Sequence, residues 1–161
     1  MVSKVEILNS IGDEIKIIKH LASKIKEEHL GYQPSDKQRT MLQLLQYLTY
    51  CGMGPATIVV TGNRDHGKKM NEDSAKVNLS NFAAAMDDQM KRIEVVLKDL
   101  DDKALSEKDA TQPWGIPQKA GAALINKALK FLVGYRMQLF LYMKAAGIPN
   151  LGTSNCWMGV D

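Results

Sequence analysis

The chain has 161 residues, of which 45% are hydrophobic and 24% are charged. This length and balance predict one globular domain over residues 1–161 and exclude a disordered or fibrous protein. The 21 basic and 18 acidic residues are interleaved and leave a formal charge of only +3. Nucleic-acid binders usually concentrate a larger positive excess on one face, so we expect no nucleic-acid partner.

The cysteine positions and the N-terminal residues indicate the cellular compartment. Cys51 and Cys156 are far apart and form no Cys-x-x-Cys pair, so neither a metal knuckle nor a redox dithiol is predicted. Lys4 and Glu6 put charges where a signal peptide needs an apolar core, and Arg136 interrupts the most apolar run. We therefore expect a reduced cytoplasmic protein that has no membrane partner.

Helical periodicity begins near the N-terminus. The first predicted helix has one apolar face, formed at spacings of three and four by Leu8, Ile11, Ile15, Ile18, Ala22 and Ile25. Thr40 and Gln43 form a capping-box pattern that starts a second helix. The second helix is expected to kink at Pro55, and its buried stripe is predicted to be Met41, Leu44, Leu45 and Leu48.

The second half of the chain shows two more helices. The polar range 61–77 predicts a long crossover loop. A third helix then starts at a cap on Asn78 or Ser80, with a stripe of Phe82, Met86, Met90, Ile93, Leu97 and Leu100. After a connection over 101–118, a fourth helix is predicted to stop at Gly147, with a stripe of Leu124, Ala128, Phe131, Tyr135, Leu139 and Tyr142. The tail is expected to pack back through Trp157 and Val160.

Four amphipathic helices of this length bury their stripes most simply as a bundle. The predicted fold class is therefore all-α, an antiparallel four-helix bundle with a long crossover loop between its second and third helices. Bundle cores can hold cofactor sites on facing helices. The aromatic residues inside the apolar stripes, Tyr47 on the second helix with Phe131 and Tyr135 on the fourth, mark the place to look.

These segments resemble the DinB/YfiT-like family of four-helix-bundle proteins. The range 40–48 is similar to the family's second helix, where an apolar pair is followed by a histidine. The range 131–147 is similar to its last helix, where two histidines four apart are followed by arginine, a small residue and glutamine. The resemblance implies a homodimer and, in metal-binding members, a divalent ion held by three histidines.

This chain departs from that pattern at every metal-binding position. The resemblance places the three histidines at Tyr47, Phe131 and Tyr135. Phenylalanine offers no donor atom, and neutral tyrosine is a poor ligand because its usual pKa is about 10. His20, His29 and His66 share no helical spacing that would rebuild a site. We predict no metal, no other cofactor and no catalytic residue.

Six residues are predicted to line an inherited pocket: Tyr47, Cys51, Phe131, Tyr135, Arg136 and Gln138. Cys51 lies one helical turn after Tyr47, and a small buried hydrophobe is the commoner role for such a cysteine. Two functions stay open. The first is a metal-free protein that binds a small apolar ligand or acts as a dimeric scaffold. The second, implied by the resemblance, is a metal-dependent thiol transferase or hydrolase with other ligands, for which a thiol would be the small-molecule partner.

Overall fold

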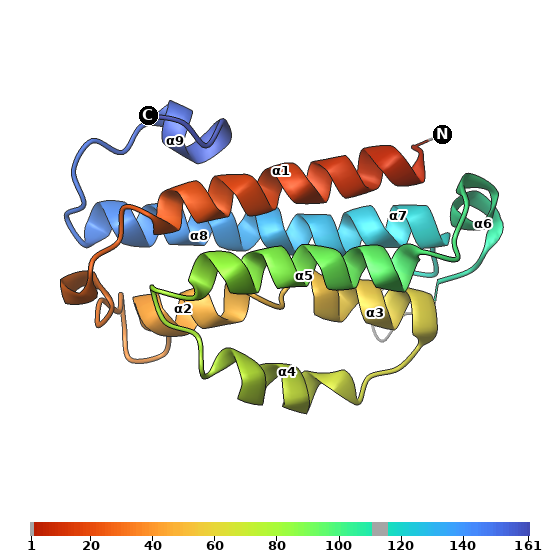
Figure 1. The fold of residues 1–161 in the computed structure, drawn as a ribbon, viewed down its shortest axis with the longest axis horizontal. Helices are drawn as coiled ribbons and strands as arrows, with labels where there is room; N and C mark the ends of the chain where they lie inside the picture. The colour runs from red at the N-terminus through yellow and green to blue at the C-terminus, as the bar shows by residue number, and fades with distance from the viewer. Residues whose placement is uncertain (1, 111–115) are drawn as a thin grey trace.

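The computed structural model describes residues 2–110 and 116–161, and these residues form the predicted all-α fold (Figure 1). Among the described residues, no helix has the length and apolar character needed to cross a bilayer. The helical elements are α1 (Lys4–Ala22), η1 (Glu27–His29), α2 (Met41–Leu48), α3 (Met53–Thr61), α4 (His66–Ser74), α5 (Phe82–Leu97), α6 (Asp102–Glu107), α7 (Ala120–Leu124), η2 (Ile125–Leu129), α8 (Lys130–Ala145) and α9 (Thr153–Trp157).

The long elements pack as four rods: α1, α2 with α3, α5, and the continuous run α7–η2–α8 (Figure 1). The Lys4 amide donates to Asp102 just beyond α5, and Lys19 pairs with Asp87 near the start of α5, so α1 and α5 are antiparallel. Not every neighbour is antiparallel, however. The crossover carries the chain back along the bundle, so that α3 and α5 run side by side in the same direction (Figure 1).

The crossover itself differs from the prediction of a loop. Residues 66–74 form the helix α4, which lies along the outside of the bundle (Figure 1). Sequence periodicity missed it because Met70 is its one large buried apolar side chain. Lys68 and Lys69 near its start and Asp73 near its end also oppose the helix dipole. Neither cap predicted for the next helix was right, since Asn81 occupies the N-cap of α5.

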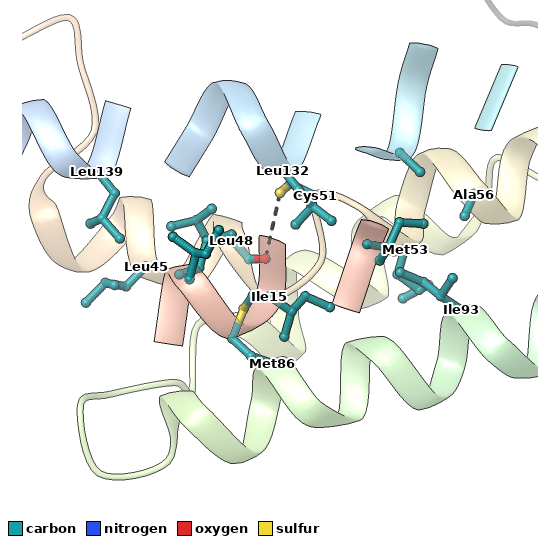
Figure 2. Packing of buried hydrophobic residues seen from close by; sticks show 14 of the residues in the cluster. Ile15, Leu45, Leu48, Cys51, Met53, Ala56, Met86, Ile93, Leu132 and Leu139 are labelled. Carbon is teal, nitrogen blue, oxygen red and sulfur yellow. Dashed lines mark hydrogen bonds between the residues drawn. The ribbon is translucent and has the colours of Figure 1, made fainter. Parts of the chain in front are cut away.

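The predicted kink near Pro55 is a full break between α2 and α3, over residues 49–52. Gln89 of α5 is buried there and supplies the missing hydrogen bonds: it accepts from the Gly52 and Met53 amides at 3.0 and 3.2 Å and donates to the Leu48 carbonyl at 3.0 Å. Gly52 has no room for a side chain, because a Cβ would lie 2.8 Å from Leu132. The break is therefore a tightly packed part of the core (Figure 2).

The last rod corrects the predicted stripe of the fourth helix. The turn η2 is π-helical and accommodates one extra residue. After it, Leu132 and Arg136 are buried, whereas Phe131 and Tyr135 of the predicted stripe are only partly buried. Leu124, Ala128, Leu139 and Tyr142 are buried as predicted. Gly147 ends the helix as predicted, with a φ of 82°.

The C-terminal tail packs back on α1 and α8 through α9, as expected, but Trp157 and Val160 are not its most buried side chains (Figure 1). Trp157 and Val160 are 56% and 46% exposed, whereas Asn155 and Cys156 are buried. The predicted connection 101–118 contains α6, and residues 111–115 of it lie outside the described part of the chain.

Candidate functional site

The three positions that the resemblance assigned to metal ligands lie side by side. Tyr47 comes from α2, and Phe131 and Tyr135 come from successive turns of α8. The ring centroids of Tyr47 and Tyr135 are 4.6 Å apart, and those of Phe131 and Tyr135 are 6.2 Å apart, both edge to face. Phe131 and Tyr135, which follow η2, lie at the edge of the core beside Tyr47 of α2, and the three rings form an aromatic wall next to the crossover.

Two residues outside the predicted set extend this wall. The Tyr50 ring lies 5.0 Å from Tyr47, and its hydroxyl donates to the Asn71 side chain of α4 at 3.3 Å. The Arg39 guanidinium lies 4.1 Å from the Tyr47 ring centroid and 5.9 Å from that of Tyr135. A cation at these distances is attracted by the negative faces of both rings.

Among the cavities between α4 and the bundle, two are lined by both Tyr47 and Tyr50. The first is mainly apolar and has a volume of about 160 Å³, with walls that include Cys51, Pro55, Ile58, Met70 and Phe131. The second is polar and has a volume of about 310 Å³, with walls that include Arg39, Gln43, Gln46, Asn71 and Ser74. The crossover helix therefore completes the site.

Burial determines the protonation states of the Tyr47 and Tyr50 hydroxyls and of the Cys51 thiol. Cys51 is 1% exposed and its sulfur lies 3.7 Å from the Leu48 carbonyl oxygen (Figure 2). Burial raises the pKa of the Cys51 thiol. Burial also raises the pKa of the Tyr47 hydroxyl, with a smaller contribution from its hydrogen bond to Tyr135, and it raises the pKa of Tyr50. The site thus presents neutral hydroxyls and a neutral thiol, with no activated nucleophile among them.

Arg136 and Gln138 lie away from these cavities. Arg136 is 1% exposed and its Nε is 2.6 Å from Glu14 Oε2 on α1. Its Nη1 donates to the Cys156 carbonyl oxygen, and its guanidinium lies 4.6 Å from the centroid of the Trp157 ring. Gln138 donates to the Tyr142 hydroxyl at 3.0 Å and lines a separate groove on the outer face of α8. Both side chains therefore belong to other parts of the bundle.

The residues at the aromatic wall do not fit a divalent ion. Phe131 has no donor atom, and the raised pKa of Tyr47 keeps its oxygen protonated. His20 lies beside Asp161 and His29 beside Glu28, and neither lines the two cavities. Among the described side chains, no group of three histidines, cysteines or carboxylates is close enough to hold a metal.

Comparison with solved structures places this architecture among known folds. A DinB-like protein of Bacillus subtilis, YjoA, superposes with a TM-score of 0.67 at 16% identity, covering 91% of this chain and 96% of that one. The chain has the DinB-like fold. A DinB-like protein of Bacillus cereus superposes with a TM-score of 0.68 at 15% identity, covering 94% of this chain and 99% of that one. No protein-family model and no curated protein matches the sequence.

Sequence reasoning missed the side of this DinB-like bundle that α4 covers. The signal that was present is a single apolar residue, Met70, in an otherwise polar run. Such a residue marks the point where a surface segment contacts the body of the protein. Arg39 carried no comparable signal, because its position over Tyr47 and Tyr135 depends on how the chain enters α2.

Proposed function

We propose that this protein binds a small apolar ligand, without a metal, in the cavity lined by Cys51, Ile58 and Phe131. The supporting observation is the cavity itself, about 160 Å³ of mainly apolar space beside Tyr47 and Phe131. A buried apolar cavity of about 150 Å³ is large enough to take up benzene. A small aromatic molecule is therefore the size of ligand that this cavity accommodates.

The affinity follows from the number of atoms that the cavity can cover. Indole has about nine heavy atoms, and at roughly 0.5 kcal/mol per atom it should bind with a Kd of about 0.5 mM. Binding should shift the amide NMR signals around Cys51 and Phe131 while those of α9 stay unchanged. Indole that shifts no signal at the cavity at several times this concentration contradicts the proposal.

A matched pair of variants tests the location. Ile58→Phe fills the cavity and should abolish indole binding, because Ile58 is one of its walls. Ile125→Phe makes the same exchange at a partly buried isoleucine that lines a different groove, next to α6 and α7, and should leave binding unchanged. Equal losses in both variants would place the ligand elsewhere or show a general loss of structure.

Elemental analysis of protein purified without an affinity tag distinguishes the metal-free proposal from the metal-dependent alternative. We expect less than about 0.1 equivalent of any divalent metal, because the aromatic wall offers poor ligands. A stoichiometric metal would overturn the metal-free proposal. It would favour instead an enzyme in which the ion activates a small thiol.

A homodimer through the outer face of α8 is the second part of the proposal. Leu141 is 57% exposed and borders a groove of about 490 Å³ that also contains Tyr32, Pro34 and Met137. A two-fold interface places the same surface against itself, so a protruding leucine can enter the partner copy's groove. Leu141→Lys should convert the dimer to a monomer in light scattering, whereas Val95→Lys, at an equally exposed valine on α5, should not. A monomeric parent protein overturns this part.

A further inference from the structure

The positive charge of Arg39, at the edge of the two cavities, is not paired with any described carboxylate. Arg39 contacts the faces of Tyr47 and Tyr135, and no described carboxylate forms an ion pair with it. Two other arginines do form ion pairs with carboxylates: Arg92 pairs with Asp88, and Arg136 pairs with Glu14. Aromatic faces hold the Arg39 guanidinium in place but leave its charge uncompensated.

The cavity beside Arg39 is suited to an anion. Its lining, Arg39, Gln43, Gln46, Tyr47, Tyr50, Asn71, Ser74 and Ala75, contains no acidic side chain. The Gln43 side-chain carbonyl is occupied by the Thr40 amide at 2.9 Å, which leaves the Gln43 amide group as a donor. Gln46, by contrast, already donates to the Ala75 and Val77 carbonyls. One uncompensated cation therefore faces a polar space of about 310 Å³.

The polar and apolar cavities share one wall. Tyr47 and Tyr50 line both, and their ring centroids are 5.0 Å apart. The guanidinium of Arg39 lies 4.1 Å from the centroid of Tyr47, a ring that also lines the apolar cavity. A ligand with a short flexible chain is therefore long enough to contact both the apolar cavity and Arg39.

We propose that the natural ligand class is an amphiphilic organic anion: an aromatic or short aliphatic body in the cavity at Cys51 and Phe131, joined by a few methylenes to a carboxylate that pairs with Arg39. This inference rests on the proposed apolar-ligand function. It adds the charge of the ligand and says which of its two ends lies in which cavity. Arg64 borders the apolar cavity and likewise forms no ion pair with a described carboxylate, but it does not line the polar cavity, as Arg39 does.

The test compares two probes with the same phenylbutyl carbon skeleton, 4-phenylbutyrate with a charged carboxylate and 4-phenylbutan-1-ol with an uncharged hydroxyl, by NMR titration of the whole chain at neutral pH. An exposed charge pair contributes up to about a fivefold gain in affinity, so the carboxylate should bind about five times more tightly than the alcohol. Raising the salt concentration should reduce this preference, because exposed charges are screened.

Variants locate the charge that is responsible. Arg39→Gln should remove the preference for the carboxylate and leave the affinity for the alcohol unchanged, and Arg39→Lys should keep part of the preference. Arg64→Gln removes the same charge from the other border of the apolar cavity and should have little effect. Arg39 is exposed, so the Gln variant is expected to fold, which its NMR spectrum checks directly.

The outcomes separate this inference from the function on which it rests. If the alcohol binds at the cavity and the carboxylate binds no better, the amphiphile inference is wrong and the apolar-ligand function stands. Equal losses in Arg39→Gln and Arg64→Gln would show only a general electrostatic attraction and also overturn it. If neither probe binds at Cys51 and Phe131, both proposals fail.

Discussion

Glu14→Leu should be among the most destabilising single changes in this protein. Glu14 is the charged partner of Arg136, with Nε–Oε2 and Nη2–Oε1 distances of 2.6 and 3.5 Å. The Arg136 side chain is 1% exposed and that of Glu14 is 14% exposed. The substitution leaves a guanidinium in the core with the carbonyl oxygen and the sulfur of Cys156 as its remaining hydrogen-bond partners.

The magnitude follows from this burial. Removing one partner of a buried ion pair costs about 3–5 kcal/mol, because the other charge stays desolvated. Arg136→Met should cost less than Glu14→Leu, since the Glu14 carboxylate that it leaves behind retains some access to water. The double variant should recover most of the loss and keep a cost of about 1 kcal/mol for the unpaired Cys156 carbonyl.

Thermal and urea unfolding measure these differences. For a chain of this size, 1 kcal/mol shifts Tm by about 2–4 °C, so Glu14→Leu should lower Tm by roughly 6–20 °C. Asp87→Leu is the matched control: it breaks the Lys19–Asp87 pair, which also joins α1 to a neighbouring helix at 2.6 Å, but whose side chains are 31% and 53% exposed. It should cost less than about 1 kcal/mol.

Two results would refute this reasoning. One is a Glu14→Leu variant as stable as the Asp87→Leu control, which would mean that Arg136 reaches water when its partner is lost. The other is strict additivity of Glu14→Leu and Arg136→Met, because a coupled pair must show an interaction free energy in the double-mutant cycle.

Three further predictions concern the core and the candidate site. Gln89→Leu should cost about 3 kcal/mol in urea unfolding, because it leaves the buried Gly52 and Met53 amides without partners and the Leu48 carbonyl with only the weak Cys51 thiol donor. The triple variant Tyr47→His, Phe131→His, Tyr135→His should bind zinc in a calorimetric titration, because these positions lie side by side. Cys51 should react with iodoacetamide far more slowly in the native protein than in urea, because burial raises its pKa and lowers its thiolate fraction.

Each of the three has its own control. Gln43→Leu removes an exposed glutamine from a helix cap and should cost about 1 kcal/mol, so a loss as large as that of Gln89→Leu contradicts the special role of the buried amide. The parent protein should show no zinc binding in the same titration. A triple variant that is folded but does not bind zinc contradicts the assignment of these three positions to metal-binding histidines. Alkylation of native Cys51 at the rate of a free thiol contradicts its burial.

The sequence determined the helices that have strong periodicity. The α2 stripe of Met41, Leu44, Leu45 and Leu48 is buried as predicted, and the capping box of Thr40 and Gln43 is present. These features are local: a repeat of three and four residues and a pair of side chains three apart carry their own physical reason. The same is true of the stop at Gly147, which depends on a single backbone conformation.

Tertiary structure decided the rest. The π turn η2 moved Arg136 into the core and Phe131 and Tyr135 towards α2, and a repeat read from the sequence cannot show where one extra residue is absorbed. The helix α4 exists against its own charge pattern, since Met70 and the Asn71 and Ala75 contacts hold it on the bundle. Arg39 lies over Tyr47 for a similar non-local reason. The cavities depend on all of these contacts, so they could be located only once the helices were packed.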